Sequence, residues 1–131
     1  MQDLIADFLS GSVFAVVGAS TNREKFGNKV LRRYMEHGLT VYPINPRESE
    51  VEGLQAYASL SDVPEPVNGV SIITPAPVTE KAVNEAIELG IPRIWMQPGA
   101  ESEAAINAAT EKGLSVIAGG PCLLIELPAL D

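Results

Sequence analysis

The stretch that most constrains the fold of this chain is residues 13–22, with the sequence VFAVVGASTN. Its first five residues are apolar and predict a buried strand, and Gly18 then permits an abrupt turn. Ser20, Thr21 and Asn22 are residue types that cap helices, and an amphipathic stretch follows them. We therefore predict a strand–turn–helix unit, with one of these three residues capping the helix.

The predicted turn has the properties of an anion site. The beginning of a helix presents backbone N–H groups without acceptors and the positive end of the helix dipole. Such a turn most naturally binds a phosphate. Lys25 falls in the first helical turn, where it either reaches the phosphate or is simply exposed. The alternative is that Gly18 only turns the chain, as in many parallel α/β domains.

A repeated pattern of helix, glycine and strand predicts the fold class. Glycine followed by an apolar residue precedes three predicted strands, at 38–39, 90–91 and 113–114. This alternation indicates one α/β domain over residues 1–131, a three-layer, doubly wound parallel sheet of five strands. The expected strands are residues 13–17, 39–44, 69–74, 91–96 and 114–118. Residues 48–68 are expected to form a short helix or a covering loop, and Thr79 to cap the helix before Gly90.

We expect the strand order 3-2-1-4-5, with the winding reversing beside the first strand. The loops after strands one and four then flank a crevice at the carboxyl ends of the strands. The loops after strands two and three, around Arg47 and Thr74, extend the same edge.

Charge and composition narrow the partners. Nine basic and seventeen acidic residues give a net charge of −8, which repels polyanions such as nucleic acids and acidic membranes. Any anionic ligand must therefore be held by local groups. No segment is long enough to cross a bilayer, and the N-terminus does not resemble a secretion signal, so we expect a cytoplasmic protein. Cys122, the single cysteine, forms no internal disulfide and lacks the second thiol or histidine of a metal site.

The loop after the second strand indicates which nucleotide suits the crevice. A nicotinamide dinucleotide site has the pattern G-x-G-x-x-G and an acidic residue at the end of strand two, and the chain has neither. Arg47 stands at that second position, and its planar guanidinium suits a phosphorylated ribose. Both NADP and coenzyme A (CoA) carry such a phosphate. The missing second glycine favours CoA.

The chain resembles the small CoA-binding proteins, which are single Rossmann-like domains similar to the CoA-binding domain of the succinyl-CoA synthetase α subunit. The resemblance rests on VVGAS at 16–20, YPINP at 42–46, TPAP at 74–77, WMQPG at 95–99 and Cys122. It implies binding of CoA or an acyl-CoA by the turn after the first strand and by three further loops. With Lys25 from the anion-site argument, the expected contacts are Gly18, Ala19, Ser20, Thr21, Asn22, Lys25, Arg47, Thr74, Pro75, Met96, Gln97 and Pro98.

The resemblance does not extend to catalysis. The synthetase needs a phosphorylated histidine in a second domain, and His37, the only histidine here, is expected to be solvated at a helix end. We expect no catalytic residue and favour a non-catalytic binding module for CoA or an acyl-CoA. The alternative is an enzyme, either an NADP-dependent oxidoreductase or part of a CoA-dependent enzyme completed by a partner subunit. The apolar residues 123–127 dock on their own sheet or on a second copy in a homodimer.

Overall fold

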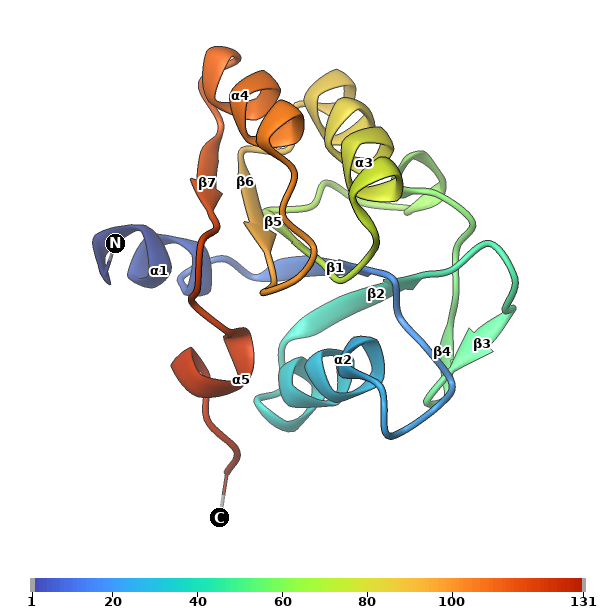
Figure 1. Cartoon of the computed structure of the whole chain (residues 1–131). Helices are drawn as coiled ribbons and strands as arrows, with labels where there is room; N and C mark the ends of the chain where they lie inside the picture. The colour runs from blue at the N-terminus through green and yellow to red at the C-terminus, as the bar shows by residue number, and fades with distance from the viewer. Residues whose placement is uncertain (1, 131) are drawn as a thin grey trace.

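The computed structural model describes residues 2–130 and contains one main sheet of five parallel strands (Figure 1). In spatial order these are β2 (Thr40–Ile44), β1 (Val13–Val17), β5 (Gly69–Ile72), β6 (Arg93–Met96) and β7 (Ser115–Ile117). The predicted α/β class and the five-stranded parallel sheet are confirmed. β1 occupies the predicted residues, and the other strands lie within the predicted ranges.

The order of the strands corrects one detail of the prediction. Counted along the chain, the strands of the main sheet lie in the order 2-1-3-4-5, because β5 pairs directly with β1. The expected order, 3-2-1-4-5, would have put β5 beyond β2. Both orders allow right-handed crossovers, so the apolar pattern does not distinguish them. The winding therefore reverses between β1 and β5, and not between β1 and β6.

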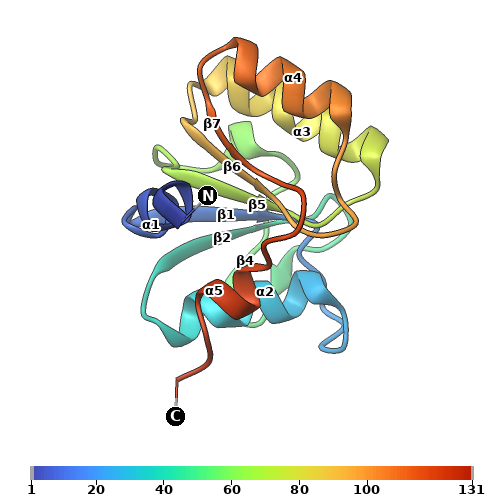
Figure 2. The same ribbon diagram turned by 60° about the vertical axis from the view of Figure 1, so that its left-hand side comes forward.

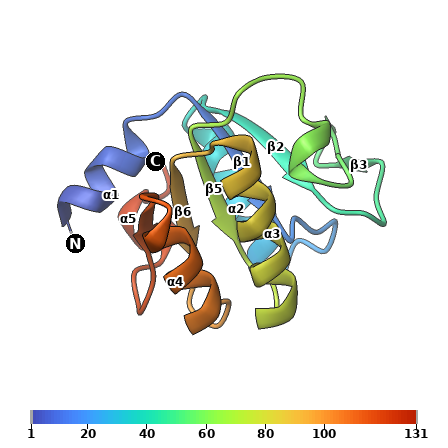
Figure 3. The same cartoon turned by 90° about the horizontal axis from the view of Figure 1, so that it is seen from above.

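Helices cover both faces of the sheet (Figure 2). On one face lie α1 (Gln2–Leu9), α2 (Phe26–Glu36) and α5 (Leu123–Glu126). On the other face α3 (Ala76–Leu89) and α4 (Glu103–Glu111) lie side by side (Figure 3). Successive residues of β1 alternate between the faces, with Val16 packed toward α2 and Val17 toward α3. Burial on both faces explains why the strands are continuous apolar runs.

The C-terminal segment docks on its own chain. Leu123 is fully buried, and Arg33 of α2 donates from Nη1 to the carbonyl oxygens of Leu124 at 2.6 Å and Leu127 at 2.8 Å. His37 is bonded through Nε2 to the Pro128 carbonyl oxygen at 2.8 Å, so it holds this segment and is not simply solvated.

Two helices begin at other residues than predicted. α2 begins at Phe26, and its N-cap Lys25 makes no side-chain capping bond, so capping by Ser20, Thr21 or Asn22 was wrong. α3 begins at Ala76, which places Thr79 in its first turn instead of at its cap. The prolines near this start are compatible with a first helical turn, where the N–H has no partner within the helix.

Residues 48–68, which were expected to form a short helix or a covering loop, contain a hairpin that was not predicted and one short helix. A short antiparallel hairpin joins β3 (Glu50–Val51) to β4 (Leu54–Gln55), and the 3-10 helix η1 (Leu60–Asp62) follows. Glu52 and Gly53 have φ angles of 51° and 82°, the left-handed values of a type I′ turn. The hairpin and α1 lie at opposite ends of the molecule (Figures 1 and 3).

Candidate functional site

A cleft of about 970 Å³ opens at the carboxyl ends of β1, β2 and β5. Its walls are the turn after β1, the loops after β2 and β5, and one side of α3, with further residues from near η1. Clefts at such a reversal of winding are where open α/β sheets bind ligands, and the volume suits a nucleotide. The observed strand order explains the position, since the reversal lies between β1 and β5.

Most of the expected contact residues come together in this cleft. Those that line it are Gly18, Ala19, Ser20, Lys25, Arg47, Thr74 and Pro75. Thr21 and Asn22 lie in the same turn but not in the lining. Residues that line the cleft without having been predicted as contacts include Gly27, Asn45, Pro46, Ser59, Val78, Lys81 and Asn84.

The loop after β6 lies outside the cleft. Neither Met96, Gln97 nor Pro98 is part of the lining. Met96 is fully buried, and Gln97 Oε1 accepts the N–H of Leu123 at 3.0 Å within the core. With β5 between β1 and β6, this loop is one strand further from the reversal than the predicted order implied. The structure therefore places these three residues away from the other predicted contacts.

The turn after β1 presents backbone donors. Within residues 2–130, the N–H groups of Ala19, Ser20 and Thr21 have no acceptor. Two N–H groups further along the turn are used locally, since Ser20 Oγ accepts the N–H of Asn22 at 3.0 Å and Asn22 Oδ1 accepts that of Glu24 at 3.0 Å. Consecutive free N–H groups beside a helix N-terminus are the donors that an oxyanion needs.

Two glycines bring the backbone segments of this site together. Gly18 has φ +94°, and a Cβ there would lie 2.2 Å from the carbonyl oxygen of Ile73. A Cβ on Gly27, in the first turn of α2, would lie 2.0 Å from the carbonyl oxygen of Gly18. Glycine in a helix costs about 1 kcal/mol relative to alanine, and a glycine at a helix start is therefore a signal of close backbone approach. Sequence reasoning used Gly18 but missed Gly27.

Three cations surround the cleft. Lys25, Arg47 and Lys81 all line it, are exposed, and have no carboxylate within ion-pair distance among residues 2–130. Of the acidic residues in the lining, Glu85 is already engaged, because its carboxylate accepts the N–H of Leu60 at 2.8 Å and the hydroxyl of Ser61 at 3.1 Å. The cleft thus offers local positive charge in a chain whose net charge is −8.

The part of the chain that the structure describes contains no group of three His, Cys, Asp or Glu side chains arranged to hold a metal ion. Cys122 is a half-buried free thiol at the N-cap of α5. None of the helices between residues 2 and 130 combines the length and the apolar character needed to cross a bilayer.

The fold and the cleft define a Rossmann-like α/β domain whose cleft lies at the reversal of winding of its sheet. Residues 12–128 match the family of CoA binding domains, and the chain belongs to that family. The predicted resemblance is thereby confirmed.

Relatives of this chain are of two sizes. It is 35% identical over 85 residues to the α subunit of ADP-forming acetate–CoA ligase II from Pyrococcus furiosus, covering 64% of this chain but 19% of that subunit. It is 29% identical over 103 residues to the uncharacterised protein YneT of Bacillus subtilis, covering 79% and 76%. The structure of a hypothetical protein from Pyrococcus horikoshii superposes with a TM-score of 0.90 at 32% identity, covering 95% and 87%. The chain thus spans about a fifth of the ligase subunit and most of the small proteins.

Proposed function

We propose that this chain binds CoA or an acyl-CoA in the cleft at the carboxyl ends of β1, β2 and β5, as a module without catalytic activity of its own. The N–H groups of residues 19–21 bind the diphosphate, with Lys25 beside them. Arg47 pairs with the phosphate on the ribose. Seven of the expected contact residues line the cleft and support the proposal. The N–H of Thr21, which has no acceptor among residues 2–130, adds to this support although Thr21 is not part of the lining.

The observation that carries the proposal is the coincidence of free N–H groups and free cations in one cleft. CoA carries a diphosphate and a separate ribose phosphate, so it needs both kinds of group at some distance from each other. Arg47 follows β2, whereas the N–H groups follow β1, on the neighbouring strand. Membership of the CoA binding domain family supports the same ligand.

A second candidate is that the chain is the CoA-binding part of an enzyme completed by a partner subunit. The likeness to a ligase α subunit favours it, because the chain spans only 19% of that subunit. Its discriminating test is acyl-CoA synthesis by the purified chain, alone and with a ligase β subunit added. Activity that appears only with the added subunit would replace the binding-module proposal.

Calorimetric titration of the purified chain with CoA, dephospho-CoA, acetyl-CoA, NADP and NAD tests the ligand. We expect CoA and acetyl-CoA to bind more tightly than dephospho-CoA, and both dinucleotides to bind weakly. NADP binding tighter than CoA would overturn the proposal and favour an oxidoreductase.

A further inference from the structure

The carbonyl groups of the turn after β1 are tied to side chains. Asn45 Nδ2 donates to the carbonyl of Ala19 at 2.7 Å, and Asn28 Nδ2 donates to that of Ser20 at 2.8 Å. In a trans peptide the carbonyl and the following N–H point to opposite sides. Holding these carbonyls in place therefore fixes the direction of the N–H groups of Ser20 and Thr21. It also keeps two carbonyl oxygens from turning toward an anion.

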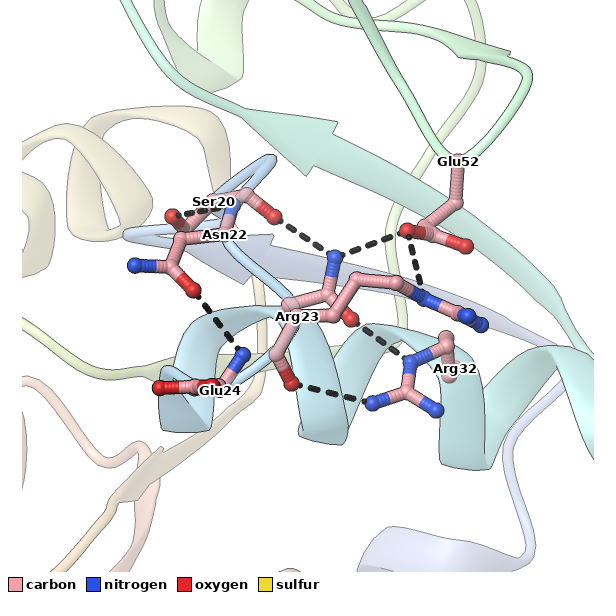
Figure 4. A network of polar contacts seen from close by, with 7 residues as sticks. Ser20, Asn22, Arg23, Glu24, Arg32 and Glu52 are labelled. Atoms are coloured by element: carbon pink, nitrogen blue, oxygen red, sulfur yellow. Dashed lines mark hydrogen bonds and ion pairs between the residues drawn. The ribbon is translucent and has the colours of Figure 1, made fainter.

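Asn28 is the centre of this arrangement, and its partners Ser20, Arg32 and Glu52 are labelled in Figure 4. Its side chain is fully buried, and besides the Ser20 carbonyl its Nδ2 donates to Glu52 Oε2 at 2.9 Å. Its Oδ1 accepts from Arg32 Nε at 2.6 Å, and Arg32 Nη2 donates to the carbonyl of Arg23 at 3.1 Å. Asn28 thus uses both the nitrogen and the oxygen of its amide. Through Asn28 and Arg32, one face of α2 donates hydrogen bonds to two carbonyls of the turn, those of Ser20 and Arg23.

Glu52 contributes to the orientation of the Asn28 amide, together with the Ser20 carbonyl and Arg32. Its carboxylate comes from the tight turn of the β3–β4 hairpin, and Oε2 also lies 3.4 Å from Arg23 Nε. If the amide flipped, Asn28 Oδ1 would face the Glu52 carboxylate and the Ser20 carbonyl, both of which are acceptors. The flipped state is therefore disfavoured, and Glu52 supplies one of the two acceptors that oppose it.

We infer that Asn28, Arg32 and Glu52 are positioning residues that hold the N–H groups of the turn after β1 in the direction in which they bind a diphosphate. None of the three lines the cleft, so each acts through the backbone of the turn. The inference rests on the proposed function for the ligand, but the geometry it concerns is tested with inorganic pyrophosphate as well.

Glu52→Ala and Glu52→Gln form a matched pair that tests this inference. Both remove the same negative charge and release Arg23, but only glutamine keeps an acceptor for Asn28. A purely electrostatic role predicts that both variants bind an anion more tightly, to the same extent. Positioning predicts that Glu52→Ala binds pyrophosphate about fivefold more weakly than Glu52→Gln, the effect of one hydrogen bond.

Arg32→Lys tests the same network at constant charge. Lysine has no planar fork to donate to Asn28 Oδ1 and the Arg23 carbonyl together, so we expect about threefold weaker binding, the effect of part of one hydrogen bond. Arg33→Lys is the matched control on the same helix, because Arg33 contacts the C-terminal segment and not the turn. It is expected to bind like the wild type.

The measurement is an NMR titration of each folded variant with pyrophosphate and with CoA, following the amide signals of Ser20 and Thr21. Equal affinities of Glu52→Ala and Glu52→Gln, or of Arg32→Lys and Arg33→Lys, would overturn the inference, as would a wild type whose turn amides do not respond to pyrophosphate. A wild type that binds pyrophosphate but not CoA would instead overturn the proposed function and leave the positioning intact.

Discussion

Gly27 lies directly against Gly18, so close that a Cβ on Gly27 would stand 2.0 Å from the Gly18 carbonyl oxygen. The contact joins the first turn of α2 to the end of β1, and it sets how near the helix N-terminus approaches the turn between them. In the dinucleotide-binding fingerprint, separate glycines make the tight turn and the close packing of helix on strand. Here the same two tasks fall to residues nine positions apart.

Gly27→Ala is predicted to lower the free energy of unfolding by about 1–3 kcal/mol, as overpacking does. A decrease in the free energy of unfolding would point to the close contact, because alanine in place of a helical glycine otherwise stabilises the fold by about 1 kcal/mol. We also expect CoA binding to weaken, since the turn must shift. Urea unfolding and calorimetry measure the two effects.

Gly113→Ala is the control for this substitution. Gly113 has φ +82° with open space around its Cα and lies outside the cleft, so alanine there costs about 1–2 kcal/mol of backbone strain but leaves CoA affinity unchanged. A Gly27→Ala protein as stable as the wild type would show that the close contact is not needed.

Local pattern was sufficient to predict the strand–turn–helix unit. β1 covers the predicted residues 13–17, and Gly18 has the positive φ that an abrupt turn requires. The cap was predicted less well, because Ser20 and Asn22 bond to N–H groups of the turn itself before the helix begins. Short polar side chains stabilise turns and helix starts by the same kind of bond, so their presence does not tell which one forms.

The strand order and the outer wall of the cleft required long-range information. The pairing of β5 with β1 depends on the path of the crossover connections, and buried parallel strands have similar apolar sequences. For that reason Lys81, on α3, was not recognisable as a cleft residue, whereas Met96 and Gln97 were expected there and lie in the core. Arg47 was predictable because it follows a strand adjacent to β1 in either order.

Arg47→Ala is predicted to weaken CoA binding about tenfold, the effect of losing a charge-assisted hydrogen bond. Binding of dephospho-CoA, which lacks the ribose phosphate, should change little. Lys112→Ala removes the same charge at an exposed residue outside the cleft and controls for the long-range field. Equal losses for both ligands would remove Arg47 from the ribose-phosphate role. Calorimetric titration of the wild type, Arg47→Ala and Lys112→Ala with CoA and with dephospho-CoA measures these affinities.

The ion pair between Asp7 and Arg93 predicts a dependence of stability on pH. Arg93 Nε lies 2.7 Å from Asp7 Oδ2, and this hydrogen bond holds the pKa of Asp7 below its ordinary value of 3.8. A carboxyl whose pKa is lower in the folded state stabilises the fold above its unfolded pKa, and this stabilisation is lost as the pH falls through the folded pKa.

We therefore expect Asp7→Asn to be less stable than the wild type at pH 7, with the difference shrinking as the pH falls below 3.8 and disappearing below the lower pKa of the folded state. Urea unfolding across this range measures it. Asp3→Asn on the same helix is the control, because Asp3 has no ion pair among residues 2–130. The difference in stability between this variant and the wild type should not shrink in the same way as the pH falls. A difference between Asp7→Asn and the wild type that stays constant with pH would contradict the assignment to this ion pair.

A buried hydroxyl pair joins α2 to the centre of the sheet and predicts a coupled loss of stability. The Tyr34 hydroxyl lies 2.6 Å from Ser71 Oγ, both residues are fully buried, and burial raises the pKa of Tyr34 above its ordinary value. Removing one partner leaves the other without a hydrogen bond, so Tyr34→Phe and Ser71→Ala should each cost about 1–3 kcal/mol of unfolding free energy.

The double variant should lose less stability than the sum of the two single losses, with a coupling energy of about 1 kcal/mol. Urea unfolding of the four proteins gives this cycle, and strictly additive losses would contradict it. Neither residue lines the cleft, so CoA affinity should stay at the wild-type value throughout the cycle.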